Sequence, residues 1–444
     1  MFEQKSVNDH SMNIEVQVAK LGSGPLAEAG LREHIWPLFS RALAGDKARN
    51  EIYLANHSLG RPLDQMALDV NEGIEAWYSQ MDSAWGQGAW WGEMNSYRSQ
   101  VGKLIGINDP TAVVPKTSAG QGLRAVLNAL PQDGTTLPVR VLATSAEFDS
   151  IDFILKTYAK KGRAEIDWVP MQLDASNSQN ILNAIKPGFD LIVISMVVFA
   201  TGEVISCLDE IVQKAHAVGA LVMLDTYHTA AIIPINMTRL DADFMIGGCY
   251  KYARGGPGAC WLAVHPKHLG GELRTLDTGW FAKKDPLGYE RSDEPILSES
   301  GDAWLESTPP VLTYYQARSG LTLTLAIGVE RLRKYNLVQQ EMLREAFAEN
   351  GVEYVRPLKP EERGAFTLVP SRDSHALVSA LKSARINTDA RGGFVRFGPD
   401  ILNSEAELIE AAKITGETIR SCVESKTHGN SCEIIDDRPN RTRR

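Results

Sequence analysis

The sequence has few cysteines, and none of them belongs to a recognisable pair. Five occur among 444 residues, with no C-x-x-C motif and no spacing typical of a zinc site. We therefore expect reduced thiols in a cytoplasmic protein and no metal centre. The chain also lacks an apolar run long enough to cross a bilayer, and its first residues lack the apolar core of a signal peptide. Neither a membrane span nor export is expected.

Positive charge is also scarce. Lys and Arg number 46 against 55 Asp and Glu, which gives a formal net charge of -9. Nucleic acids and anionic membranes bind clustered cations, so neither is an expected partner. No G-x-G-x-x-G motif follows the first expected strand, which argues against a nicotinamide oxidoreductase.

The middle of the chain alternates β-rich runs with helical patterns. The runs are continuously apolar, which is typical of parallel strands buried on both faces. This repetition predicts an α/β fold with a mostly parallel, doubly wound sheet. The last strand follows its neighbour after a loop too short for a helical crossover, so it should run antiparallel. The expected strands are 139–144, 190–195, 220–225, 243–247 and 259–264, and the expected helices are 122–130, 151–162 and 208–219.

The length and a change of pattern near residue 310 predict more than one domain. A long helical stretch at 312–336 precedes short strands near 365–370 and 393–398 and a closing helix at 404–425. That order suits a smaller α+β domain. The expected division is an N-terminal segment 1–50 packing with the small domain, a large domain 51–310, a small domain 311–425 and a flexible tail 426–444.

Several chemically useful residues fall where strands end, the edge at which open α/β sheets bind ligands. The turn of Ser118, Ala119 and Gly120 opens a helix and could bind an anion, or could be a simple N-cap. Phe148 could cover a flat ring or belong to the core. Lys251, in "GGCYKYARGGPG", could be a desolvated amine that forms imines or a surface lysine.

Asp225, in "LDTYH", closes an apolar strand and must be paired or otherwise needed, because burying a lone carboxylate is costly. With His228 it could bind a metal, but the chain offers no convincing third ligand nearby. One cofactor, pyridoxal phosphate, accounts for all four features. It needs a lysine for the imine, a carboxylate for the pyridine nitrogen, an aromatic lid and an anion cradle.

The sequence resembles the kynureninases, within the class V, fold-type-I pyridoxal phosphate enzymes. "GGCYKYARGGPG" and "LDTYHTAAIIPI" resemble their cofactor region. Further matches are collinear from about residue 50 to 400, and they are "YLANHSLGRPL", "VVFATGEV", "TGWFA", "STPPVL" and "DARGGFVRFG". The resemblance implies a fold-type-I enzyme that uses pyridoxal 5′-phosphate.

The resemblance also implies roles for individual residues. Lys251, Asp225 and Tyr250 would be catalytic, with Lys251 bonded to the cofactor and Asp225 on its ring nitrogen. His228 would support the ring, and Phe148 would stack on it. The phosphate would be held by Tyr250 and the turn of Ser118, Ala119 and Gly120.

Other matched residues concern the substrate and a second subunit. Arg396 matches the arginine that binds the substrate's α-carboxylate, whose planar shape suits a guanidinium fork. His57 and Ser58 lie in the segment resembling N-S-L-G and would also be on the substrate side. Trp280 and Thr308 match residues that reach the phosphate from the other subunit, which implies a homodimer with shared active sites.

Some substrate-side positions depart from the kynureninase pattern. Ile151 stands where the family has an aspartate, Lys283 stands at or near a histidine position, and residues 399–402 replace a P-L-Y run. We therefore expect an L-α-amino acid substrate other than standard kynurenine, with Cα deprotonation followed by hydrolytic Cβ–Cγ cleavage or a related β-bond cleavage. The alternatives are a β-eliminating C–S or C–X lyase, a class V aminotransferase, and a pyridoxal-binding protein without catalysis.

Overall fold

The computed structural model describes residues 13–86, 88–130, 138–171, 177–289, 291–355 and 359–427. The expected tail 426–444 lies outside these residues from 428 onward. Its first two residues belong to the last helix, α14 (Glu405–Thr427), which runs slightly further than the sequence predicts. Among the described residues, no helix is long and apolar enough to span a membrane.

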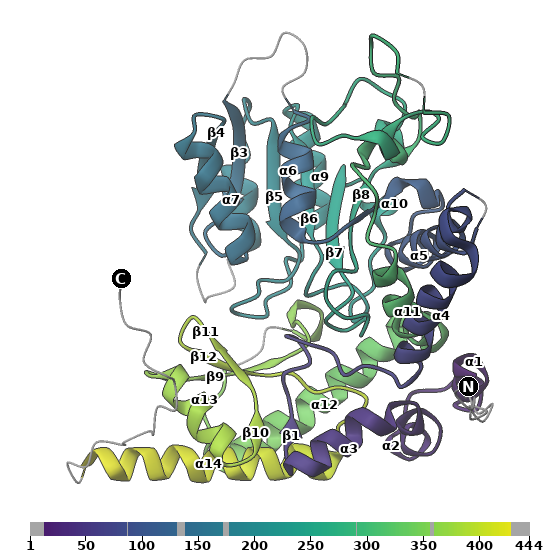
Figure 1. Ribbon diagram of the computed structural model, residues 1–444. Coiled ribbons are helices and arrows are strands. Elements are labelled where there is room, and N and C mark those ends of the chain that lie inside the picture. Colours follow the sequence, from purple (N-terminus) through teal and green to yellow (C-terminus); the bar gives the residue numbers. More distant parts are fainter. Residues whose placement is uncertain are drawn as a thin grey trace, which may run out of the picture.

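A seven-stranded sheet forms the centre of the larger part of the molecule (Figure 1). All neighbouring pairs are parallel except those of β8, which runs antiparallel to β7, as predicted, and also to β2, which the sequence did not predict. The strand order is β2-β8-β7-β6-β5-β3-β4. The bounds are β2 Val113–Lys116, β3 Val139–Thr144, β4 Ala164–Val169, β5 Leu191–Ser195, β6 Leu221–Asp225, β7 Phe244–Gly248 and β8 Cys260–Val264.

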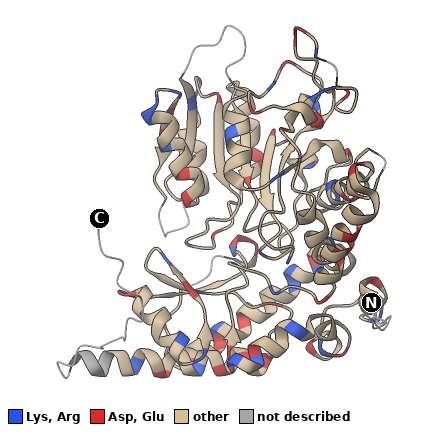
Figure 2. Ribbon diagram, viewed as in Figure 1, with Lys and Arg blue, Asp and Glu red and all other residues tan. Residues whose placement is uncertain are grey.

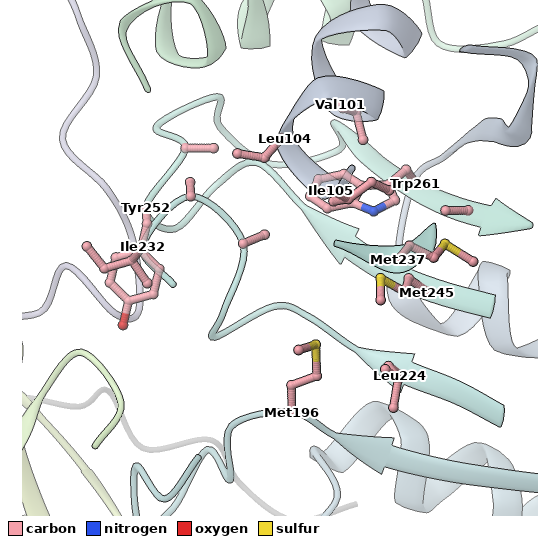
Figure 3. Close-up of a cluster of buried hydrophobic side chains, with 14 of the residues drawn as sticks. Val101, Leu104, Ile105, Met196, Leu224, Ile232, Met237, Met245, Tyr252 and Trp261 are labelled. Carbon is pink, nitrogen blue, oxygen red and sulfur yellow. The ribbon is translucent and has the colours of Figure 1, made fainter. Parts of the chain in front are cut away.

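Helices cover both faces of this sheet, which explains why its strands are continuously apolar. In β5, Leu191 and Val193 belong to a cluster with α6 (Ala119–Leu127) and α7 (Asp149–Lys160), whereas Ile192 and Ile194 belong to the cluster on the opposite face. That second face carries α5 (Ala89–Ile105), α8 (Asn177–Ala184), α9 (Leu208–Ala217) and α10 (Met237–Leu240). Figure 3 shows Trp261 of β8 packed beside Ile105 of α5.

A second, three-stranded antiparallel sheet follows in the C-terminal part. It has the order β11-β12-β9, with β9 Thr367–Pro370, β11 Asp389–Arg391 and β12 Phe394–Phe397. Helices α12 (Val329–Glu349), α13 (Ser374–Ser383) and α14 pack against it around a core that includes Phe347 and Phe397.

The long helical stretch expected at 312–336 is two helices rather than one. α11 (Leu312–Ile327) ends at Gly328, and α12 begins at Val329. Gly328 has a φ of 90°, which a continuous helix does not allow and which glycine adopts without strain.

The N-terminal segment runs beside both parts of the molecule. Its helices are α1 Ile14–Ala19, α2 Glu28–Gly30, α3 Ser40–Arg49 and α4 Gln65–Gln80. Between α3 and α4, the short strand β1 (Ile52–Tyr53) pairs in parallel with β10 (Ile386–Asn387). Acidic and basic residues are interspersed along the lower helices in Figure 2, as the charge balance of the sequence suggests.

Candidate active site

The predicted site residues come together where the central strands end. A cavity of about 210 Å³ opens at the carboxyl ends of β5 and β6, between the starts of α6 and α7 and the β7–β8 connection. Its wall includes seven of the residues expected from the sequence: Ser118, Ala119, Phe148, Asp225, His228, Tyr250 and Lys251. Gly120 is buried in the first turn of α6 and is not part of the wall.

Lys251 is buried beside His228. Its Nζ lies 2.8 Å from His228 Nε2, and its side chain is almost fully enclosed. Burial lowers the pKa of Lys251 to about 7, and the nearby positive charge of Arg396 adds to that effect. Burial, followed by the charge of Lys251, also holds the pKa of His228 well below its ordinary value. At neutral pH, His228 is therefore an uncharged neighbour of an amine that loses its proton readily.

Asp225 closes β6 without a cationic partner. It accepts a hydrogen bond of 2.8 Å from the Tyr227 backbone N–H, and no described lysine or arginine forms an ion pair with it. Burial raises its pKa to about 6. A buried carboxylate in this setting is stabilised by a cation from a ligand, and a protonated pyridine nitrogen is such a cation.

The start of α6 contributes Thr117, Ser118 and Ala119 to the cavity wall. Ser118 is the N-cap of the helix, and its Oγ accepts a hydrogen bond from Gln121 N at 3.2 Å. Gln121 Oε1 in turn accepts from the Thr117 backbone N–H at 2.8 Å, so the turn is fixed from both sides. A helix start of this kind favours a phosphate group.

Aromatic rings line the other side of the site. Phe148, at the start of α7, meets Phe199 edge to face with the ring centroids 5.4 Å apart. Tyr250 lies next to the lysine, and burial raises the pKa of its hydroxyl to about 12, so it stays protonated at neutral pH. His228 Nδ1 is buried and has no hydrogen-bond partner. Residues of these types fit pyridoxal phosphate: an amine, a carboxylate, flat rings, an anion-binding turn and an unsatisfied polar atom.

Arg396, His57 and Ser58 converge on one carboxylate that the sequence did not single out. Asp389 accepts hydrogen bonds from Arg396 Nε at 2.7 Å and from Ser58 Oγ at 2.9 Å, and it lies 2.8 Å from His57 Nε2. Arg396 Nη2 makes a second bond to it, and Nη1 donates to the Phe199 carbonyl at 2.7 Å.

This cluster stands behind the cavity rather than on its wall. Arg396 is 2% exposed and is not a wall residue. Burial alone would raise the pKa of Asp389, but His57 and Arg396 hold it well below its ordinary value. Burial lowers the pKa of His57 to about 4. Asp389 begins the segment "DARGGFVRFG", so the sequence shows that it lies seven residues before Arg396. The sequence does not show its contacts with His57 and Ser58, which are more than 300 residues away.

Gly60 explains why the segment of Ser58 lies so close to the lysine. Its N–H donates to the Tyr250 carbonyl at 2.8 Å, and a Cβ on Gly60 would be 2.1 Å from the Lys251 carbonyl oxygen. No side chain fits there, so glycine is required for the two backbones to pass at this distance.

Trp280 and Thr308 do not line the cavity of their own chain. Trp280 begins a 3-10 turn (Trp280–Ala282) and stacks on Tyr289, and Thr308 is exposed. The segment before Thr308 is nevertheless hydrogen-bonded to the start of α6 and to the strand before it. Glu306 Oε1 accepts from Gln121 Nε2 at 2.8 Å and from Lys116 Nζ at 2.9 Å.

Ile151 belongs to the first turn of α7 and is fully buried in the core. It therefore supplies no polar group to the cavity, although Phe148, three residues earlier, is on the wall. Among the described residues, no group of three or more His, Cys, Asp or Glu side chains could hold a metal ion.

Known proteins that are similar in sequence to this chain include several kynureninases. A kynureninase from Pseudomonas fluorescens is 24% identical over 377 residues, covering 83% of this chain and 89% of the relative. One from Bacillus anthracis is 22% identical over 414 residues, covering 88% and 93%.

Solved structures show the same fold. The cystine C–S lyase C-DES, in complex with its product cysteine persulfide, matches with a TM-score of 0.73, 18% identity and coverage of 83% of this chain and 98% of that chain. A cysteine desulfurase from Thermococcus onnurineus NA1 matches with a TM-score of 0.73, 17% identity and coverage of 84% and 95%.

The family model for aminotransferase class-V matches residues 74–394, which include the whole seven-stranded sheet and every residue of the cavity wall. This match confirms the fold-type-I architecture and the cofactor expected from the sequence. The chain therefore belongs to the aminotransferase class-V family, and its cofactor is pyridoxal 5′-phosphate.

Proposed function

We propose that the protein is a kynureninase-like enzyme that removes the Cα proton of an L-α-amino acid and then cleaves a bond at Cβ. The observation that carries this proposal is the arrangement of the Lys251 amine 2.8 Å from neutral His228, on the same cavity wall as Asp225. The kynureninase relatives, which cover most of the chain, favour hydrolytic Cβ–Cγ cleavage over other reactions of the family.

In this proposal each residue has a defined task. Pyridoxal phosphate supplies an electron sink for the electrons left when the Cα proton departs. Lys251 Nζ takes that proton, and its lowered pKa makes it a base near neutral pH. Asp225 holds a positive charge at the ring nitrogen, Phe148 covers the ring, and the turn around Ser118 holds the phosphate.

The position of Lys251 is tested by borohydride reduction of the protein with its cofactor, followed by peptide mapping. We expect the label on the peptide that contains Lys251, and Asp225→Ala should abolish turnover and weaken cofactor binding. Lys283→Ala serves as the matched control and should label normally. A label on Lys283, or near-normal turnover in Asp225→Ala, would contradict the assignment.

We further propose that the substrate's side chain differs from that of kynurenine. Ile151 is apolar and buried where the family has an aspartate, whereas the wall residues that serve the cofactor keep their expected types. Arg396 is held behind the cavity by Asp389 and the Phe199 carbonyl, and we propose that it exchanges the Phe199 contact for the α-carboxylate when the substrate enters.

The reaction type is tested by incubating the enzyme with kynurenine, 3-hydroxykynurenine and a panel of β-substituted amino acids, and identifying products by mass spectrometry. Cβ–Cγ cleavage gives alanine, β-elimination gives pyruvate, and transamination gives the matching oxo acid. We expect alanine from the preferred substrate and slow release of anthranilate from kynurenine. A kcat/KM for kynurenine in the usual enzyme range of roughly 10⁴–10⁸ M⁻¹s⁻¹ would refute the altered specificity.

A further inference from the structure

Glu147 is a buried acid next to the site to which the proposed mechanism gives no role. It lies between β3 and α7, directly before Phe148, and is 4% exposed. Its Oε1 accepts from Thr144 Oγ1 at 2.6 Å, and its Oε2 accepts from Ser195 Oγ at 2.6 Å. The Ser195 backbone N–H also donates to Oε1, at 3.3 Å. One side chain therefore joins the ends of two neighbouring strands, β3 and β5.

The residues joined by Glu147 are those that shape the cavity. Phe148, the next residue, is on the wall, and so is Ser195. Ser195 is also the register partner of Asp225 in the pairing of β5 with β6. Glu147 thus connects the turn that carries the aromatic lid to the strand pair that carries the carboxylate.

No described lysine or arginine forms an ion pair with Glu147. Burying a carboxyl group without a cation is costly, and a plain core residue at this position would avoid that cost. Its three donors offset part of it, because each would otherwise be a buried polar group without a partner. The buried carboxyl group lowers the stability of the fold, but it fixes the position of Phe148 relative to Ser195 and Asp225. The arrangement is explained if that position is needed for function.

We propose that Glu147 is a positioning residue of the active site, which holds the Phe148 turn at a fixed place against Ser195 and Asp225 so that the cofactor ring fits between the lid and the carboxylate. The inference rests on the proposed function, since it assumes that Phe148 covers the ring. Glu147 itself does not reach the wall and touches neither cofactor nor substrate.

The electrostatics agree with this role. Burial, together with the smaller effect of the nearby charge of Asp225, raises the pKa of Glu147 to about 7. The cavity wall also carries Lys251 and His228, and the Asp389–Arg396 pair lies behind it. The wall's remaining ionisable groups are Tyr227, Tyr250 and Cys260, and burial raises the pKa of each.

Three variants separate positioning from simple stability. Glu147→Gln keeps the shape: its carbonyl can accept from Thr144 and the Ser195 N–H, and its amide can donate to Ser195 Oγ. Glu147→Ala loses all three bonds, and Glu147→Asp is too short to span both strands. The readouts are the dissociation constant for pyridoxal phosphate, the visible circular dichroism of the bound cofactor, which reports ring orientation, and Tm.

We expect Glu147→Gln to bind the cofactor within about threefold of the wild type, whereas the alanine variant weakens by about tenfold or more. The alanine variant should also have an altered visible dichroism. If it does not fold, the aspartate variant supplies the same comparison. The comparison variant is Asp243→Asn, at another buried acid that lies directly before β7, at the end of the strand opposite the cavity. Asp243 accepts from Val222 N at 2.7 Å and, unlike Glu147, is also paired with Lys267, His216 and His268. This substitution should lower Tm and leave cofactor affinity and dichroism unchanged.

The inference is overturned if folded Glu147→Ala or Glu147→Asp protein binds the cofactor with wild-type affinity and dichroism. It is equally overturned if Asp243→Asn alters both to the same extent, since the effect would then be general destabilisation. A wild-type protein that binds no pyridoxal phosphate would instead contradict the proposed function.

Discussion

Lys251 shows how one residue's surroundings set its chemistry. Its amine contacts an uncharged histidine and aromatic rings, and no described acid forms an ion pair with it. The charged form therefore loses its hydration without gaining a strong partner, and the pKa falls from its ordinary value to about 7. The amine is protonated below that pH and neutral above it.

This predicts a pH dependence for uptake of the cofactor by the apoprotein. Because only the neutral amine attacks an aldehyde, the rate of covalent uptake should rise as pH increases to about 7 and then level off. Stopped-flow absorbance of apoprotein mixed with pyridoxal phosphate measures that rate. Lys283→Ala should give the same profile, and a midpoint near the ordinary lysine value would show that the site does not lower the pKa.

Residues whose partners are close in sequence were easier to predict than residues whose partners are distant. Lys251 and Asp225 each follow an apolar strand, so their place at one edge of the sheet could be inferred from local pattern. Glu147 and Asp389 could not be recognised in this way. Their contacts come from Ser195 and from residues 57 and 58, and a single sequence gives no measure of such proximity.

At the scale of elements, the buried strands were predicted closely and the edge strands were missed. β3, β5, β6, β7 and β8 differ from the expected ranges by a residue or less at each end. β4 has only β3 as a neighbour, so its sequence "AEIDWV" alternates polar residues and lacks the continuous apolar signal. The break at Gly328 was missed because both flanking segments favour helix.

Gly328 and Gly92 form a matched pair that tests the helix boundary. A Cβ on either would meet no atom within 4 Å, but Gly328 has a φ of 90° and Gly92 lies inside α5. Gly328→Ala should therefore lower the free energy of unfolding by more than about 1 kcal/mol. Gly92→Ala should raise it by about 0.5–1 kcal/mol, because alanine favours the helix. Denaturant unfolding measures both, and equal effects would show that backbone conformation at residue 328 is unimportant.

At the scale of the whole molecule, large apolar side chains are exposed near the end of α4. Trp77, Tyr78 and Met81 are all more than half exposed. Such a surface suits contact with another protein. We propose that this surface, together with Trp280 and Thr308, which do not line the cavity of their own chain, belongs to the interface of the homodimer that the resemblance implies. The division at residues 50, 310 and 425 stays a prediction.

Shared sites predict recovery of activity from two inactive variants. Lys251→Ala destroys the site of its own chain, and a Trp280→Ala/Thr308→Ala variant would damage the site of its partner. Randomly mixed dimers should recover about a quarter of the sites, as a two-fold interface requires. Lys251→Ala mixed with Asp225→Ala is the control. It should recover no activity, because each variant lacks a residue of its own chain's cavity and no dimer then contains an intact site. A monomer at working concentration would rule out sharing.

The β7–β8 connection has a consequence for how this protein can change in length. Lys251 lies between two strands that are in register from Phe244 and Val264 to Gly248 and Cys260. Gly60 also contacts its backbone, so the connection cannot take up an extra residue by bulging outward on that side. An insertion there would displace the amine or break the pairing. The number of residues in this loop is therefore as constrained as the identity of the lysine, and natural variants should differ in length elsewhere.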